Sequence, residues 1–340
     1  MDVNVAIYLD KNYAVPATVM VRSLIDNAAA ETRIQLFVLA IGLTGDEKRA
    51  MALHWPEDRL KVQWIDLDWV PYERGFQRVN YISKAAYARL LIDRCLPSNV
   101  ERVITMDCDG LVLDDIGELW GRPDGAHSVM AVRDPCVPRL QDDASEFMQR
   151  LADGKETPYF NSGLMVVNLK KWRELAVTDR CLALGERCAG QTNYADQSLL
   201  NAILQGAWEP LPLRWNCNRR HLAIHAYPSL RDRFYPLAEV RQALSHPAFL
   251  HFLSRDKPWH PTPFHPHREI YRHYLKEAMR MGDDEAENRM RQREDAVGKR
   301  FFPLVCYRQA SRLRRKLGLP ASRLANLMHL FKECLVDPAA

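Results

Sequence analysis

The first hundred residues alternate short apolar runs with segments whose apolar residues recur at helical spacing. A short apolar run bounded by turn residues predicts a strand, and helical spacing predicts an amphipathic helix. The predicted strands are 3–9, 34–40 and 60–67, and the predicted helices are 15–27, 44–53 and 84–93. Strands that alternate with helices predict an α/β fold with a mainly parallel sheet, whose ligands bind beyond the carboxyl ends of the strands.

The second half of the chain is less regular. Strands are predicted near 128–133, 164–168, 208–211 and 249–252, and helices at 143–151, 169–188 and 195–205. This pattern suggests a mixed second half of the same sheet. Prolines crowd residues 247–266, and because proline interrupts regular structure we expect a boundary there. We therefore predict a main domain at 1–265 and a helical extension at 266–340.

The composition is that of a globular protein, with 47% of the 340 residues hydrophobic and 26% charged. Residues Met1 to Asn4 have neither the basic lead nor the long apolar run of a signal peptide. No segment approaches the roughly 18 apolar residues expected of a membrane-spanning helix. The eight cysteines are scattered without Cys-x-x-Cys pairs. We therefore expect reduced thiols and a cytoplasmic protein.

A strongly basic segment runs from Arg289 to Arg323. It holds eleven Lys or Arg against two acidic residues, a net charge of +9, and leaves −5 for the rest of a chain whose total is +4. Aromatic residues such as Phe301, Phe302 and Tyr307 lie among these cations, as in a helix on an anionic membrane surface. A solvated basic helix that packs on the body is an equal alternative. No nucleic-acid-reading motif accompanies the charge, so no nucleic-acid partner is expected.

Two aspartates one residue apart, Asp107 and Asp109, follow the apolar run 102–106. Alternate residues of an extended chain point to the same side, so both carboxylates can face one point just past a strand end. Hard cations such as Mg²⁺ and Mn²⁺ prefer oxygen ligands, and Mg²⁺ sites commonly combine one or two carboxylates with substrate phosphates. The pair therefore indicates either a metal site for a nucleotide diphosphate or an acidic turn.

A second strand-end carboxylate is Asp10, which is followed by Asn12 and Tyr13. The first strand-to-helix loop of an α/β sheet is a favoured nucleotide position, where an acid, an amide and an aromatic ring can bind a base. A cap for the helix that begins near Val15 is the structural alternative. The loop has no Gly-x-Gly-x-x-Gly, which disfavours a dinucleotide-binding dehydrogenase.

Three later stretches carry further polar side chains. Asn161 lies in a predicted polar turn that enters a buried strand. Asp196 and Gln197 precede an apolar helix, where Asp196 either caps the helix or binds a sugar hydroxyl. His251 and Lys257 follow a strand and offer a third metal ligand and a cation for a phosphate. Each stretch alone also has a structural interpretation.

Together and in this order, these stretches resemble glycosyltransferase family 8 over residues 1 to about 260. The resemblance implies a single Rossmann-like nucleotide-sugar transferase domain of the GT-A type with a mixed central sheet. It also implies a retaining enzyme that moves a hexose from UDP-glucose or UDP-galactose to a saccharide acceptor. The acceptor would be a lipopolysaccharide-type or other cell-surface glycan. A lipid-linked acceptor would suit a cytoplasmic enzyme attached to the inner face of the membrane.

The resemblance also assigns roles to residues. Asp107, Asp109 and His251 would bind Mn²⁺, with Mg²⁺ as the alternative. The remaining positions would hold the uridine (Asp10, Asn12, Tyr13), contact the diphosphate or sugar (Arg89, Lys257), and line the sugar pocket (Asn161, Asp196, Gln197), with Asp134 near the sugar or acceptor. The catalytic positions would thus be Asp196, Gln197 and Asp134. Retention would come from front-face attack rather than from a covalent intermediate on Asp196.

The chain departs from the family at Tyr8, Lys11 and Ser254, where a small residue, an acid and a glycine are usual. Ser254 bears on the loop between His251 and Lys257, because glycine permits backbone angles that serine resists. Two rival functions stay open. A nucleotidyltransferase acting on a sugar phosphate also pairs carboxylates on such a sheet, although it usually shows a Gly-rich triphosphate loop. A non-catalytic sugar-nucleotide-binding scaffold is the other.

Overall fold

The computed structural model describes residues 1–290 except 54, 57, 69, 73–75, 77–83, 144, 153–155, 189–190, 222–234, 254–256, 261–264, 283–284 and 287–289. The chain forms two compact units. The first comprises Met1–Cys217 and Asp232–His251, and the second comprises Asn218–Arg231 and Phe252–Ala340. The first unit contains every predicted site residue except Lys257.

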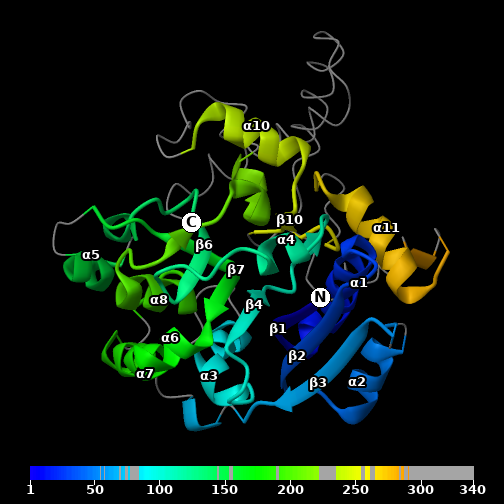
Figure 1. Ribbon diagram of the computed structural model, residues 1–340, viewed down its shortest axis with the longest axis horizontal. Coiled ribbons are helices and arrows are strands. Elements are labelled where there is room, and N and C mark those ends of the chain that lie inside the picture. Colours follow the sequence, from blue (N-terminus) through cyan, green and yellow to red (C-terminus); the bar gives the residue numbers. More distant parts are fainter. Residues whose placement is uncertain are drawn as a thin grey trace, which may run out of the picture. The chain divides into compact units, whose positions relative to one another are not determined.

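A seven-stranded sheet forms the centre of the first unit (Figure 1), in the order β3-β2-β1-β4-β7-β6-β8. Its strands are β1 (Asp2–Asp10), β2 (Arg33–Ile41), β3 (Leu60–Asp66), β4 (Arg102–Met106), β6 (Val129–Arg133), β7 (Phe160–Asn168) and β8 (Glu209–Pro210). Strands β3, β2, β1 and β4 are parallel, whereas β7 runs antiparallel to both β4 and β6. The predicted α/β fold with a mixed central sheet is therefore confirmed.

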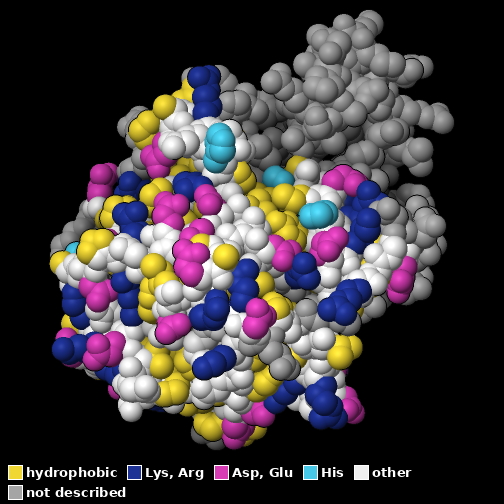
Figure 2. All heavy atoms as spheres, turned by 45° about the vertical axis from the view of Figure 1, so that its right-hand side comes forward, with side chains coloured by type: hydrophobic (Ala, Val, Ile, Leu, Met, Phe, Trp, Pro, Cys, Tyr) yellow, Lys and Arg dark blue, Asp and Glu magenta, His cyan; other side chains and the backbone are white. Residues whose placement is uncertain are grey.

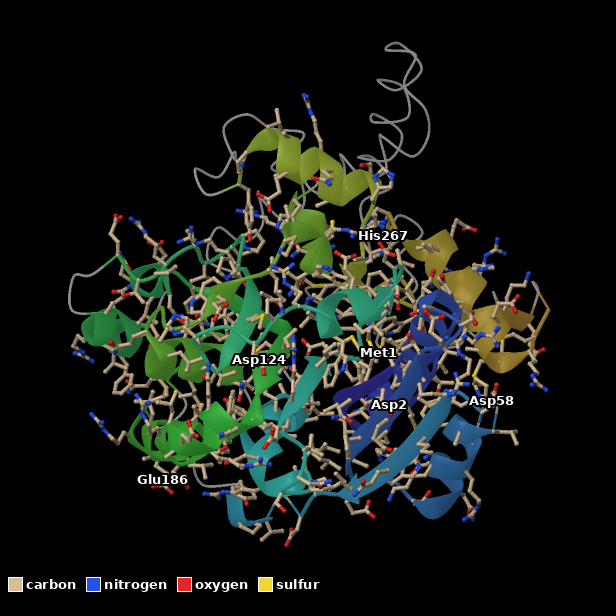
Figure 3. The ribbon with its side chains drawn as sticks, viewed as in Figure 1. Met1, Asp2, Asp58, Asp124, Glu186 and His267 are labelled. Atoms are coloured by element: carbon tan, nitrogen blue, oxygen red, sulfur yellow. The ribbon has the colours of Figure 1, made fainter. Side chains whose placement is uncertain are left out.

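The burial of β1 explains its central position. Its residues from Val5 to Leu9 are buried on both sides of the sheet, as expected for a parallel strand covered on both faces. β1 begins at Asp2, which Figure 3 labels. It pairs in parallel with β2 on one side and β4 on the other. Because the carboxyl ends of parallel strands meet at one edge, Asp10 and Asp107 lie at the same edge of the sheet.

Helices flank this sheet, with α1 and α2 beside β1 to β3 and α6 to α8 beside the other end in Figure 1. The α-helices of the first unit are α1 (Ala14–Asn27), α2 (Gly45–Ala52), α3 (Ile92–Cys95), α4 (Gly117–Trp120), α5 (Glu146–Ala152), α6 (Leu169–Glu174), α7 (Val177–Cys188), α8 (Asp196–Leu204) and α10 (Leu237–Ser245). The 3₁₀ helices are η1 (Lys11–Tyr13), η2 (Val70–Tyr72), η3 (Lys84–Leu91), η4 (Leu140–Asp142) and η5 (Leu213–Asn216). Helix α2 starts close to its predicted position because Thr44 and Glu47 form a reciprocal capping box.

Two predicted helices are divided in the structure. The helix predicted at 84–93 consists of η3 followed by α3. The helix predicted at 169–188 breaks between α6 and α7, where Ala176 has a left-handed backbone with φ of 48°. Trp172 in α6 and Cys181 in α7 are both fully buried in the main core. The break thus gives each half its own buried face.

Strand β7 is longer than predicted. It begins at Phe160, so the residues predicted as a polar turn lie inside the strand and that part of the prediction was wrong. Opposite β6 the pairing jumps from Ala131↔Met165 to Val132↔Asn161, which leaves extra residues on β7. Such a bulge bends a strand and re-aims its side chains. The polar residues are tolerated there because their hydrogen bonds are made within the site described below.

A small sheet has the order β5-β10-β9 and consists of β5 (Gly110–Val112), β10 (Phe249–His251) and β9 (Cys217–Asn218). In the second unit, α11 (Arg268–Met279) follows His267, labelled in Figure 3. The rings of Trp259 and Tyr271 lie 5.1 Å apart there.

The basic segment from Arg289 lies outside the described residues apart from Met290. Among the helices that the structure describes, none has the length and apolar character needed to cross a membrane. On the face shown in Figure 2, acidic and basic side chains of the described residues are interspersed. The predicted role of the basic segment at a membrane surface stays a prediction.

Candidate metal centre and adjoining pocket

The chain turns sharply where β4 ends, and this turn presents the two aspartates. The Asp107 amide donates to the Gly163 carbonyl at 2.8 Å, which ties the turn to β7. Cys108 points the other way, into the protein, and its Sγ lies 3.5 Å from the Tyr8 carbonyl. Asp107 and Asp109 therefore share one side of the chain, as their spacing predicts.

His251 reaches the aspartates through the pairing of β5 with β10. In this antiparallel pair His251 lies opposite Gly110, the residue after Asp109. A Cβ atom on Gly110 would lie 2.4 Å from the Phe249 ring, so only glycine permits this approach. The His251 Nε2 atom is 3.3 Å from Asp109 Oδ1 and 3.5 Å from Asp107 Oδ2. The structure thus brings together the three residues predicted as metal ligands, whose ligand atoms lie within 4.8 Å of one another.

Arg89 joins the aspartate turn to helix α8. Its guanidinium is 3% exposed and forms ion pairs with Asp107 and with Asp196, the latter at 2.8 Å. It also donates to the Ser162 carbonyl. The Tyr8 ring lies 5.0 Å from the guanidinium, close enough for a cation–π contact. Tyr8, a departure from the family pattern, therefore helps to hold a cation between the two carboxylates.

Asp196 is buried at the start of α8. Burial raises the pKa of its carboxyl from 3.8 to about 6, and the positive charge of Arg89 opposes that rise. Its Oδ2 also accepts a hydrogen bond from the Ser162 hydroxyl at 3.1 Å. The preceding residue, Ala195, has φ of 50° and ψ of −119°, a backbone region that an L-residue rarely adopts. Strain is thus located directly beside a predicted site residue.

Asp134, Asn161 and Gln197 form one hydrogen-bonded group. Asp134 Oδ2 accepts from Asn161 Nδ2 at 2.8 Å and from Gln197 Nε2 at 3.1 Å. Its Oδ1 accepts from the backbone amides of Cys136 and Val137 at 2.7 and 2.9 Å. Four donors match the acceptor capacity of an ionised carboxylate. Two predicted sugar-pocket residues, Asn161 in β7 and Gln197 in α8, are therefore adjacent to Asp134, which was predicted near the sugar or acceptor.

The sequence alone did not single out Asn216, although the structure places it beside His251. The distance from His251 Nδ1 to Asn216 Oδ1 is 2.9 Å, and Asn216 Nδ2 donates to Asn161 Oδ1 at 2.8 Å. Asn216 ends the short 3₁₀ helix η5 and is 1% exposed. Its apolar neighbours along the chain give no periodic or motif signal, so only the three-dimensional pairing reveals it.

The loop after β1 lies near the aspartate turn. Asp10 accepts from the Asn12 amide at 2.8 Å and so caps η1, whereas the N-cap of α1, the helix of the structural alternative, is Tyr13, which makes no side-chain cap bond. Burial and the negative charges of Asp109 and Asp107 raise the pKa of the Tyr13 phenol well above its usual value. That influence requires Tyr13 to lie close to both aspartates. Tyr13, one of the three residues predicted to hold uridine, therefore lies near the candidate metal centre, and Asp10 and Asn12 belong to the same loop.

Lys257 belongs to the second unit. Its side chain is 5% exposed and donates to the Phe252 carbonyl. Ser254 lies outside the described residues. The predicted contact of Lys257 with a diphosphate stays a prediction.

Comparisons with known proteins show the family to which the chain belongs. The model of glycosyl transferase family 8 matches residues 4–262. General stress protein A of Bacillus subtilis is 31% identical over 269 residues, which cover 78% of this chain and 90% of that protein. The lipopolysaccharide 1,2-glucosyltransferase of Escherichia coli is 27% identical over 193 residues, 56% of this chain and 53% of that protein.

Solved structures show the same fold. An active-site mutant of LgtC superposes with a TM-score of 0.69 at 25% identity, covering 81% of this chain and 95% of that chain. The galactosyltransferase LgtC in complex with donor and acceptor sugar analogs has a TM-score of 0.67 at 24% identity, covering 85% of this chain and all of that one. The chain therefore belongs to glycosyltransferase family 8, and its activity is glycosyl transfer.

Proposed function

We propose that this enzyme transfers a hexose, glucose or galactose, from a UDP-sugar to a saccharide acceptor with retention of configuration, using a divalent cation held by Asp107, Asp109 and His251. The observation that carries the proposal is the convergence of these three side chains at the carboxyl end of β4. Family membership supports the transfer reaction and sets the nucleotidyltransferase alternative aside.

The chemistry of the three side chains fits a divalent cation. Two carboxylates and one imidazole converge, and Gly163 leaves room for the imidazole, because a Cβ there would lie 2.2 Å from His251 Cε1. Carboxylates suit Mg²⁺ and Mn²⁺, and a nitrogen ligand favours the transition ion, so Mn²⁺ is proposed. A bound cation supplies Lewis-acid stabilisation of the negative charge that develops on the diphosphate leaving group.

The loop after β1 is proposed to hold the nucleoside. Asp10 is half-buried, Asn12 is exposed and Tyr13 adjoins the aspartates. A uridine bound by an acid, an amide and an aromatic ring here would direct its diphosphate towards the candidate metal centre. Lys257 is proposed as a further diphosphate contact, because an ammonium group binds phosphate as a point charge.

Asn161, Asp196 and Gln197 are proposed to line the donor-sugar pocket, with Asp134 near the sugar or the acceptor. Asp196 is a poor candidate for a covalent nucleophile, because its carboxylate is engaged by Arg89 and Ser162. This supports front-face attack. The acceptor oxygen would bond to the anomeric carbon on the face where the bond to the diphosphate oxygen breaks, and the acceptor proton would pass to that leaving oxygen.

The proposed acceptor is a lipopolysaccharide-type or other cell-surface saccharide. The likeness to the Escherichia coli lipopolysaccharide 1,2-glucosyltransferase supports this choice. The basic segment that begins at Arg289 would favour an anionic membrane surface, where a lipid-linked acceptor is found.

The test is UDP release from UDP-glucose and UDP-galactose with Mn²⁺, compared between wild type, Asp109→Asn and Asp58→Asn. Asp58 is an exposed residue, labelled in Figure 3, and serves as the matched control. We expect Asp109→Asn to lower turnover by roughly 10²–10³-fold with an unchanged melting temperature. Near-normal turnover of that variant would remove the metal assignment. Absence of UDP release by wild type with every UDP-sugar would favour a binding scaffold.

A further inference from the structure

A continuous chain of side-chain hydrogen bonds runs from the candidate metal centre to the sugar pocket. His251 contacts Asn216 at 2.9 Å, Asn216 contacts Asn161 at 2.8 Å, and Asn161 contacts Asp134 at 2.8 Å. Gln197 joins the same carboxylate at 3.1 Å. All five residues are at most 7% exposed, so the chain is shielded from solvent. Hydrogen bonds in such a setting are strong, and an unsatisfied group there is costly.

The direction of each bond in this chain follows from a backbone amide, which can only donate. The Gly163 amide donates to the Asn161 side chain at 3.0 Å, so the contacted atom is the Asn161 oxygen. The Asn216 atom that faces this same oxygen must then be the amide nitrogen. The remaining Asn216 atom is an oxygen, so His251 must donate to it from Nδ1–H.

A neutral histidine that donates from Nδ1 carries its lone pair on Nε2, the atom that faces Asp107 and Asp109. We propose that Asn216 is a positioning residue that selects this tautomer of His251 and links the metal centre to the Asn161 and Asp134 side of the sugar pocket. The proposal rests on the proposed function. It adds a residue with no expected contact to the donor or to the cation.

Two functions are combined in the Asn216 amide. Its oxygen holds the His251 ring, as partners of metal-binding histidines do, and removal of such a partner typically weakens metal binding about 10–100-fold. Its nitrogen holds the Asn161 oxygen and thereby leaves the Asn161 nitrogen directed at Asp134. Substitutions can separate these functions, because aspartate keeps the acceptor and removes the donor.

The experiment compares wild type, Asn216→Asp, Asn216→Leu and Asn168→Asp. Asn168 caps α6 through its oxygen, so the same substitution there keeps the bond and serves as a control. Mn²⁺ affinity in the presence of UDP is measured by calorimetry, and kcat and KM for the UDP-sugar are measured at saturating Mn²⁺. Melting temperatures identify any variant that fails to fold. If Asn216→Leu does not fold, the Mn²⁺ affinity and kcat of the near-isosteric Asn216→Asp are compared with those of wild type.

We expect Asn216→Asp to bind Mn²⁺ within about threefold of wild type while its kcat falls at least about tenfold, because the carboxylate cannot donate to Asn161. Asn216→Leu should bind Mn²⁺ about tenfold or more weakly. Equal Mn²⁺ affinity in wild type and Asn216→Leu, or weakened affinity in Asn216→Asp, would overturn the tautomer role. If wild type binds no Mn²⁺, the proposed function itself fails, which is a distinguishable result.

Discussion

At the scale of single residues, Gly163 permits the close approach of β7 and His251. A Cβ there would lie 2.2 Å from His251 Cε1 and 2.6 Å from Nδ1. We expect Gly163→Ala to displace the imidazole and to weaken Mn²⁺ binding by about tenfold or more. The control is Gly45→Ala, whose Cβ would meet only the flexible end of Arg49 at 3.3 Å. Unaltered Mn²⁺ affinity in Gly163→Ala would show that the ring is not held against this glycine.

The buried carboxyl of Asp196 makes stability depend on pH. Because burial raises its pKa from 3.8 to about 6, the native state keeps this proton where the unfolded chain has lost it. Stability from this group is therefore present at low pH and is lost as pH rises between these values. Relative to Asp196→Asn, wild type should lose about 2 kcal/mol of unfolding free energy between pH 4 and pH 7. Urea denaturation of both proteins in metal-free buffer measures this, and a pH-independent difference would contradict it.

Several site residues could be predicted from the sequence because each stands next to a recognisable local pattern. Asp107 and Asp109 follow an apolar strand at alternating spacing, and Asp196 opens a helix. Asn216 could not be predicted, since its importance comes from a partner, His251, that lies in another element. The ion pairs of Arg89 with Asp107 and Asp196 could not be predicted either, because both partners lie in other elements.

At the scale of elements, α8 begins from a strained residue. Ala195 combines φ of 50° with ψ of −119°, which suits glycine but not an L-residue with a Cβ. We expect Ala195→Gly to raise the free energy of unfolding by about 1 kcal/mol, since relief of strain outweighs the entropy of the added glycine. Ala202→Gly, inside the same helix, should instead lower it by about 1 kcal/mol. Thermal unfolding compares them, and a loss of stability in both would mean that Ala195 is unstrained.

Most strands and helices of the first unit were predicted because the spacing of their apolar residues along the sequence matches the positions that are buried in the structure. β1 and β2 are one residue longer at each end than their apolar runs suggest. The exceptions are places where tertiary contacts decide. The polar residue Asn161 is held within β7 by its hydrogen bond to Asp134. The left-handed backbone of Ala176 divides a predicted helix. The pairing of β5 with β10, which delivers His251, joins segments more than a hundred residues apart and has no local signal.

At the scale of the whole molecule, the unequal distribution of charge distinguishes the basic segment from the rest. Met290 is buried, so a truncation after this residue removes the basic segment except Arg289 while keeping a packed side chain. We expect the truncated enzyme to lose at least about tenfold of its binding to vesicles that contain anionic lipid, because each basic residue near such a surface contributes about 1 kcal/mol.

Sedimentation with vesicles measures this binding, and purely zwitterionic vesicles provide the control. Equal binding of full-length and truncated protein to anionic vesicles would show that the basic segment does not attach the enzyme to membranes.

The central claim is that Asp107, Asp109 and His251 hold a divalent cation beside the bound nucleotide. Its most direct test is a titration of the enzyme with Mn²⁺ in the presence of UDP, in which the electron paramagnetic resonance of free Mn²⁺ is recorded. Wild type and Asp58→Asn should bind one Mn²⁺ per chain, and Asp109→Asn should bind at least about tenfold more weakly. Equal Mn²⁺ binding by all three proteins would contradict the claim.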